Sequence, residues 1–183
     1  MSRLSIFNDD NAAVQESLDD HAAIGTRLQA IGVQFERWQA GQTLSAGADQ
    51  EEVLAAYHDD IERLNSHYGF TSVDVVALGP DHPQKAEMRA KFLDEHTHDD
   101  FEVRFFVDGS GMFYLHVDGR VYAVQCEKGD LISVPANTTH WFDMGERPNF
   151  KCIRFFTTPE GWVGNFTGSP IAKSFPGFDQ LTA

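Results

Sequence analysis

The stretch FEVRFFVDGSGMFYLHVDGRVYAV, residues 101–124, determines the fold class predicted for this chain. Its apolar, β-branched and aromatic runs are interrupted by the turn-like sequences DGSG (108–111) and DG (118–119). Short strands separated by such turns pair antiparallel, and several in succession predict a barrel or a double-sheet jelly roll. The runs that follow this pattern are 101–107, 112–117, 121–126, 131–134 and 151–157.

Upstream of these strands the apolar period lengthens towards that of a helix. Apolar positions predict one amphipathic helix over 19–31 and a second, longer one from Asp49 to Gly69. Strands are expected near 33–38 and 73–78, and one or two helical turns over 83–91. We therefore expect a mainly β, single domain over 1–183, with an N-terminal helical part (1–91), an antiparallel β-barrel or jelly-roll core (92–168) and a C-terminal tail (169–183).

Composition excludes several classes of function. The chain has 183 residues, 42% of them hydrophobic, which is enough for one domain with a full core. Its formal charge of -14 disfavours nucleic acid and anionic membranes, since both require clustered Lys and Arg. No apolar run suits a signal peptide or a membrane span, so a cytoplasmic protein is expected. Cys126 and Cys152 are interpreted as small buried hydrophobic residues.

The sequence HTHDDFE, residues 96–102, predicts most of a metal site. Residues of equal parity share one face of an extended strand, so His96 and His98 can converge on one point. Glu102 can join them if the intervening turn preserves parity. Arg104 lies on the same predicted strand face as Glu102, whereas the odd positions of that strand are apolar.

A fourth ligand is expected in GDLISVPANTTHW, residues 129–141. A glycine turn, a short apolar strand and a Pro-initiated turn deliver His140 to the start of the next strand. An antiparallel neighbour there can place His140 opposite the first three ligands. A register slip of one residue would turn it away.

These two stretches resemble the two motifs of the cupin superfamily. His96, His98, Glu102 and Gly109 fit the first motif, and Gly129, Pro135 and His140 fit the second. The resemblance implies a jelly roll with a centre of three His and one Glu. The chain departs from the motifs at three non-ligand positions, which are Ala90, Asn137 and Met144.

A narrower resemblance is carried by the segments Lys91–Leu93, Glu95–Phe106, Pro135–Gly145, Ile153–Phe156 and Gly161–Trp162. They are similar to those of the acireductone dioxygenase family of methionine salvage. The resemblance implies an enzyme that binds one Fe(II) or Ni(II) ion and acts on a small-molecule substrate and O2, and we expect a monomer. With Fe(II) the implied products are 4-methylthio-2-oxobutanoate and formate; with Ni(II) they are 3-(methylthio)propanoate, formate and CO.

The chemistry of these residues favours the same function. Three imidazoles and one carboxylate suit a divalent transition metal such as iron or nickel, and a six-coordinate ion keeps two positions open for a chelating substrate. Arg104 and Arg154 are candidates to bind the anionic substrate oxygens, or else surface charges whose stems cover apolar area. Phe92, Phe142 and Trp162 are candidates to wall a pocket for the thioether tail, or else ordinary core residues.

Two other functions remain open at this point. Another cupin oxidoreductase or isomerase could share the metal centre, although a phosphosugar enzyme would need a more basic pocket. A non-catalytic cupin could bind a small ligand or keep a structural zinc ion, which closes a tetrahedron of four ligands.

Overall fold

The structure is a computed structural model that describes residues 1–183. Its strands are β1 Arg3–Asn8, β2 Asn11–Leu18, β3 Gln34–Arg37, β4 Ser72–Leu78, β5 His96–Thr97, β6 Glu102–Val117, β7 Arg120–Glu127, β8 Asp130–Val134, β9 His140–Asp143, β10 Asn149–Phe156 and β11 Asn165–Phe166. Its helices are α1 His21–Gln29, α2 Gln50–Ala56, α3 His58–Tyr68, α4 Lys85–Leu93, the 3-10 helix η1 Ile171–Ser174 and α5 Phe178–Leu181. None of the helices combines the length and apolar composition needed to cross a bilayer.

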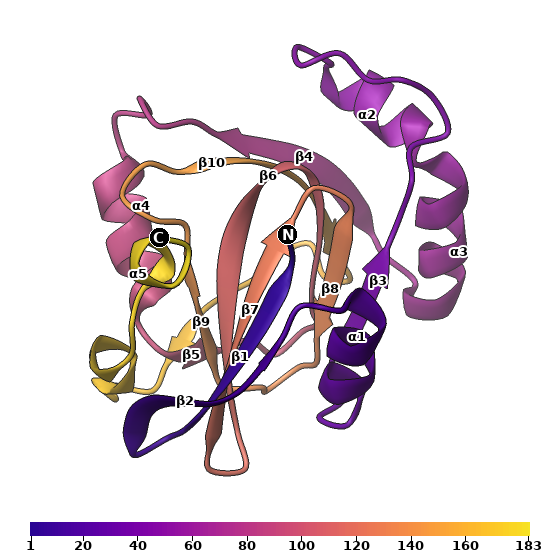
Figure 1. The fold of residues 1–183 in the computed structure, drawn as a ribbon. Coiled ribbons are helices and arrows are strands. Elements are labelled where there is room, and N and C mark those ends of the chain that lie inside the picture. The colour runs from indigo at the N-terminus through magenta and orange to yellow at the C-terminus, as the bar shows by residue number, and fades with distance from the viewer.

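All eleven strands belong to one strongly curved antiparallel sheet (Figure 1). The main path runs β11-β5-β9-β6-β7-β1-β2, while β8 and β10 both pair with β6 and are extended by β3 and β4. This confirms the predicted mainly β, cupin-type antiparallel architecture. The strands do not close into a hydrogen-bonded ring, because β2, β3, β4 and β11 each have a neighbour on one side only.

Strand β6 is the central strand of the sheet, and it is longer than the sequence predicts. The runs 101–107 and 112–117, predicted as two strands joined by a turn, form one strand of 16 residues. The DGSG sequence bends it instead: Gly109 has φ +71, and a Cβ there would lie 1.9 Å from the Asn149 carbonyl oxygen. At this bend the pairing with β10 shifts register, so β6 exchanges its partners β8 and β10 for β7 and β9.

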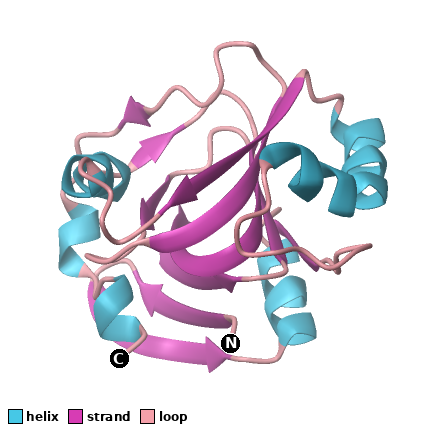
Figure 2. Cartoon of the chain, turned by 90° about the horizontal axis from the view of Figure 1, so that it is seen from above, coloured by secondary structure: helices cyan, strands magenta, loops and turns pink.

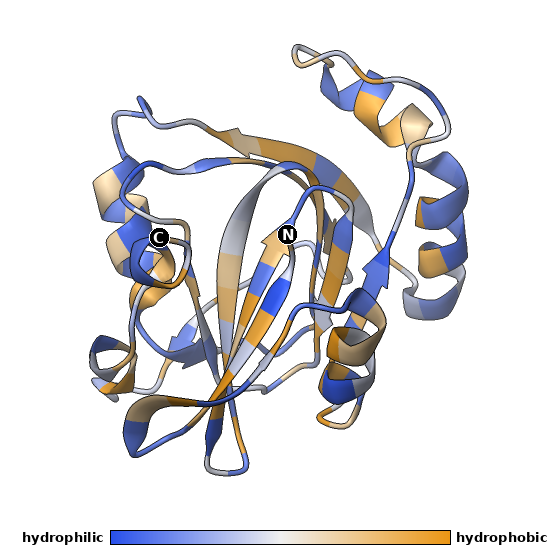
Figure 3. Cartoon of the chain, viewed as in Figure 1, coloured by the Kyte–Doolittle hydropathy of each residue, from blue (hydrophilic) through white to orange (hydrophobic).

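The helices lie around the strands rather than between them (Figure 2). Helices α2 and α3 lie on one side of the sheet, and α4 and α5 on the other (Figure 1). The predicted first helix is α1, capped by the Asp20 carboxylate, and α4 confirms the helical turns expected over 83–91. In Figure 3, α3 is mostly hydrophilic, whereas the central strands carry long hydrophobic stretches. The core therefore belongs mainly to the sheet.

The long helix expected from Asp49 to Gly69 is two helices. Tyr57, with φ -114 and ψ 18, ends α2 and precedes α3. Its buried ring packs 4.6 Å, centroid to centroid, from that of Phe105 on β6. Packing of this aromatic side chain into the core accompanies the break, whereas the helix periodicity on either side is as predicted.

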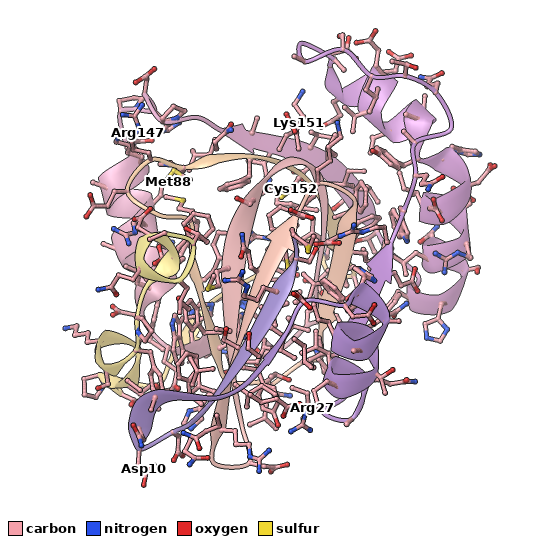
Figure 4. All side chains as sticks on the ribbon, viewed as in Figure 1. Asp10, Arg27, Met88, Arg147, Lys151 and Cys152 are labelled. Atoms are coloured by element: carbon pink, nitrogen blue, oxygen red, sulfur yellow. The ribbon has the colours of Figure 1, made fainter.

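Three hydrophobic clusters form the core. The largest contains Phe113, Phe142 and Cys152 and is joined by Met88 of α4; Met88 and Cys152 are labelled in Figure 4. A second lies under α2 and α3, and a third packs the C-terminal residues against Trp141. Strands β1 to β4 draw residues 1–91 into the same sheet, and β1 and β2 have no counterpart among the predicted elements.

Candidate metal centre

The four predicted ligands come from three neighbouring strands. Strands β5, β9 and β6 are adjacent in the sheet, and His96 on β5 pairs directly with His140 on β9. His98 follows β5, and Glu102 is the first residue of β6. All four side chains are buried, and one donor atom from each lies within 4.8 Å of the others. The sheet thus brings together residues that are up to 44 positions apart in the chain.

Each imidazole is oriented by a backbone carbonyl. A carbonyl oxygen only accepts hydrogen bonds, so the Nδ1 atom of each ring carries a proton and Nε2 is the atom left to bind a metal ion. The three Nδ1 contacts are His96 to Asp94 O (2.7 Å), His98 to Val163 O (2.8 Å) and His140 to Thr138 O (2.7 Å).

The donor set fits a divalent metal ion. Glu102 Oε2 lies 2.9 Å from His98 Nε2 and 3.0 Å from His140 Nε2. Two Nε2 atoms and a carboxylate oxygen therefore lie close enough together for one cation to bind all three. Three imidazoles and one carboxylate are the ligand types that iron and nickel accept.

The shifted pKa values of His96 and Glu102 suit metal binding, whereas, against the effect of burial, Glu102 raises the pKa of His98. Burial lowers the pKa of His96 to about 4, so this ring is neutral at pH 7. Burial alone would raise the pKa of Glu102, but Arg104 and the two imidazoles outweigh it and hold that pKa well below its usual value. A neutral imidazole and an ionised carboxylate can bind a metal ion without first releasing a proton.

Three of the four ligands, His96, His98 and Glu102, line a cavity of about 400 Å³. The aromatic residues predicted as a pocket wall, Phe92, Phe142 and Trp162, all line it. The cavity therefore has a polar floor of ligands and an apolar wall. Its remaining lining residues are Arg104, Lys91, Val163, Gly164 and Phe166.

Arg104 extends the polar floor. Its Nη2 donates to Glu102 Oε1 at 2.9 Å, which leaves Oε2 facing the imidazoles. The guanidinium carbon lies 4.8 Å from the ring centroid of Phe142 and 5.1 Å from that of Trp162. The Nε–H group is buried and has no hydrogen-bond partner. A buried donor without a partner is costly, so this group is suited to an acceptor on a bound ligand.

Arg154, the other predicted substrate-binding arginine, lies outside the cavity lining. It pairs in register with Arg104, but its guanidinium forms two hydrogen bonds with the Asp74 carboxylate on β4, at 2.8 and 2.7 Å. The sequence makes Arg154 a candidate because it is a charged residue in an otherwise apolar strand; Asp74 on the neighbouring strand holds its guanidinium outside the cavity.

Sequence reasoning missed three residues that line the cavity, Val163, Gly164 and Phe166. Strand β11 has only two residues, too few for a periodic signal. It also missed Glu95, a buried carboxylate whose Oε2 lies 2.8 Å from His116 Nδ1. His116 has no ligand-like spacing in the sequence, and its partner is 21 positions away.

The fold and the centre together define a metal-binding cupin. Residues 3–164 match the family model described as the ARD/ARD' family. The chain is 59% identical over 176 residues to an acireductone dioxygenase of Methylococcus capsulatus, covering 96% of this chain and 95% of that protein. It is 55% identical over 181 residues to the enzyme of that name in Aquifex aeolicus, covering 99% and 98%.

A solved structure agrees with these relatives. The acireductone dioxygenase from Bacillus anthracis, which holds a cadmium ion in its active centre, superposes with a TM-score of 0.78 and 31% identity. The match covers 91% of this chain and 98% of that one. The chain belongs to the acireductone dioxygenase family.

Proposed function

We propose that this protein is a metal-dependent dioxygenase that cleaves 1,2-dihydroxy-3-keto-5-(methylthio)pentene with O2. The Fe(II) form gives 4-methylthio-2-oxobutanoate and formate, and the Ni(II) form gives 3-(methylthio)propanoate, formate and CO. The products of each form contain all the atoms of the substrate and of one O2 molecule. The observation that carries the proposal is the cluster of four buried donors, three of which line a cavity with an aromatic wall.

We propose His96, His98, Glu102 and His140 as the ligands of one metal ion per chain. A bound Fe(II) or Ni(II) ion supplies a Lewis-acid centre with open positions for two adjacent oxygens of an enediol. Glu102 is the only carboxylate among the ligands, so a divalent centre stays net positive. That charge favours a substrate that binds as an anion.

Arg104 is proposed to bind the substrate oxygens. Its unpartnered Nε–H supplies a charge-assisted hydrogen bond to an enediolate oxygen, while its ion pair with Glu102 fixes the guanidinium in place. Phe142 and Trp162 flank the guanidinium and keep water from its faces. Binding an anion at this donor lowers the cost of removing protons from the enediol.

Phe92, Phe142 and Trp162 are proposed to hold the methylthio tail. Their aromatic faces and edges offer an apolar surface to a thioether, whose sulfur is polarisable. The polar end of the substrate then lies on the ligands and Arg104, and the tail lies along the wall.

The test is oxygen uptake with this acireductone, measured on apoprotein reloaded separately with Fe(II) and Ni(II). We expect uptake with both metals and CO only from the Ni(II) form. No uptake with either metal would reject the proposed activity and favour another cupin function. Zinc bound with no exchangeable position would favour a structural metal. Unchanged activity in His96→Ala would reject the ligand assignment.

We also propose a monomeric enzyme in the cytoplasm. All four proposed ligands and every cavity-lining residue come from one chain, so the site needs no second subunit. Light scattering coupled to size-exclusion chromatography is expected to give the mass of one chain, 20.5 kDa. A larger mass would reject the monomer without affecting the ligand set.

A further inference from the structure

The segment 163–167, here called the rim segment, carries unusual apolar exposure. Val163 is 60% exposed and Phe166 is 52% exposed, and they are two of only four large hydrophobic side chains that are exposed in the chain. Both line the cavity above the metal ligands. Exposed apolar side chains at the mouth of a cavity indicate a surface that a ligand covers.

The rim segment is tied to β5 and to His98, which follows that strand. The Val163 carbonyl accepts from His98 Nδ1 at 2.8 Å, and Phe166 pairs with His96 between β11 and β5. Asn165 Nδ2 donates to Asp99 Oδ1 at 3.0 Å. The wall and the ligand strand are therefore one unit, and the position of the wall is fixed relative to the metal centre.

A buried carboxylate anchors the end of the rim segment. Thr167 Oγ1 donates to Glu95 Oε1 at 2.8 Å, and Thr167 N donates to the Glu95 carbonyl at 3.1 Å. The other carboxylate oxygen of Glu95 lies 2.8 Å from His116 Nδ1 on β6. Glu95 thus joins the rim segment to the central strand of the sheet.

The rim segment also lies close to the reacting end of the cavity. The Phe166 ring centroid is 5.7 Å from that of His96. A Cβ added at Gly164 would lie 4.0 Å from His96 Cδ2, so a larger side chain there would fill space beside this ligand. A substrate whose oxygens lie on the ligands therefore has its tail within reach of Phe166.

We propose that Val163 and Phe166 determine which substrate tail the enzyme accepts, and that Glu95 acts through Thr167 as a positioning residue for them. This inference rests on the proposed function. An apolar thioether tail covers both side chains and removes their apolar surface from water, whereas a hydroxyl-ended tail of equal length loses its own hydration without gaining a partner. The rim segment thus favours the uncharged apolar tail.

The experiment compares two acireductones, one ending in methylthio and one ending in a hydroxyl group, on the metal-loaded enzyme. Phe166→Ala is expected to raise KM for the methylthio substrate about tenfold, corresponding to partial loss of the burial of a Phe side chain. Its KM for the hydroxyl-ended substrate and its kcat for both are expected to stay near the wild-type values. Val14→Ala, at a 48% exposed residue on β2, is the matched control and should change neither KM.

Thr167→Val is the second variant, because it removes the hydroxyl donor to Glu95 and keeps the size of the side chain. It is expected to raise KM for the methylthio substrate in the same direction and by less, with one metal ion retained per chain. Loss of metal together with an equal fall in kcat for both tails would show a merely structural segment and overturn the proposal.

Two further outcomes overturn the inference alone. The first is an equal KM change for both tails in Phe166→Ala. The second is a wild-type preference for a tail that ends in a carboxylate, since Lys91 rather than Phe166 would then select the tail. A wild-type enzyme that takes up no oxygen with any acireductone rejects the proposed function instead, before any rim variant is compared.

Discussion

Glu102 and Asp143 are buried carboxylates on the neighbouring strands β6 and β9, and each is paired with an arginine. Asp143 accepts four N–H groups: two from Arg89 at 2.8 and 3.2 Å, one from Gly145 at 2.9 Å and one from Phe178 at 2.8 Å. Every strong acceptor direction of this carboxylate is filled by the protein itself.

The surroundings of Glu102 are incomplete by comparison. One oxygen accepts from Arg104, but the other faces two imidazole Nε2 atoms whose rings carry their protons on Nδ1. Arg104 in turn keeps one buried N–H without a partner. The comparison teaches that a carboxylate held by four N–H groups is structural, whereas a buried charge beside an unpartnered donor and two Nε2 atoms marks a place for a ligand.

The largest expected effect is on the free energy of unfolding, and it is expected at Asp143. Asp143→Ala leaves Arg89 half-buried without its partner and removes the anchor of the C-terminal residues at Phe178. Breaking a buried ion pair costs about 3–5 kcal/mol, and we expect a loss of unfolding free energy of that order. Urea unfolding measures it, with kcat/KM of the folded enzyme changing far less.

Asp74→Asn is the matched control for this variant. It also removes a carboxylate paired with an arginine, Arg154, but both partners are about a third exposed. Exposed pairs contribute about 0–1 kcal/mol, so the loss of stability should be correspondingly small. Equal losses in the two variants would contradict the assignment of Asp143 as a structural anchor.

The next largest effect is expected on metal affinity, at Glu102. Glu102→Gln keeps the shape of the side chain and removes the charge that the ligand set supplies. We expect at least about a 100-fold loss of metal affinity, more than partners around a ligand usually contribute, and a matching loss of oxygen uptake. Adding Fe(II) or Ni(II) should raise the unfolding midpoint of the wild type and leave that of the variant nearly unchanged.

The contrast between Glu102 and Asp143 fails if Glu102→Gln still binds one ion per chain and is stabilised by it. Glu102 would then be a structural carboxylate like Asp143, and the metal centre would have three ligands. Metal content after dialysis, measured beside the shift in unfolding midpoint, distinguishes this result from loss of the fold.

A smaller effect is expected at Arg104 and Arg154, which pair in register on β6 and β10. Arg104→Met removes the proposed substrate-binding charge while keeping the apolar stem, and it should lower kcat/KM about 10–100-fold, on the order expected for a lost charge-assisted contact. Arg154→Met removes an arginine that is bound to Asp74 outside the cavity, and kcat/KM should stay near that of the wild type. Equal losses would show that the site extends to Arg154.

Arg104 and Arg154 also show how much of the site can be predicted from the sequence. Period-two alternation places Glu102 and Arg104 on one face, and the structure keeps them there, 2.9 Å apart. The same alternation does not say towards which neighbouring strand a side chain leans, so it could not separate Arg104 from Arg154. That choice depends on Asp74, which is 80 positions away from Arg154.

The contacts that the sequence could not give are those made between distant short segments. His140 was predictable because a turn and a strand precede it and because its motif resembles that of the cupins. The rim segment and the four donors around Asp143 leave no periodic signal, since β11 has two residues and Phe178 lies 35 positions beyond its acceptor. Only the folded sheet brings them together.

The smallest expected effect is the pH dependence of Asp143. Burial alone would raise the pKa of this carboxyl group, but Arg89 and the N–H groups of Phe178 and Gly145 outweigh it and lower that pKa below 3.8. A carboxylate whose pKa is lower in the folded state stabilises the protein above its unfolded pKa, and this stabilisation is lost as pH falls through the folded pKa.

Asp143→Asn cannot lose a proton, so its own contribution does not vary with pH. The difference in unfolding free energy between wild type and Asp143→Asn, measured by urea unfolding, should therefore be constant from pH 7 to about pH 5 and shrink below about pH 4. A difference that stays constant into that acid range would mean that the carboxylate is no more stabilised in the folded chain than in the unfolded one, and the contrast with Glu102 would then rest on geometry alone.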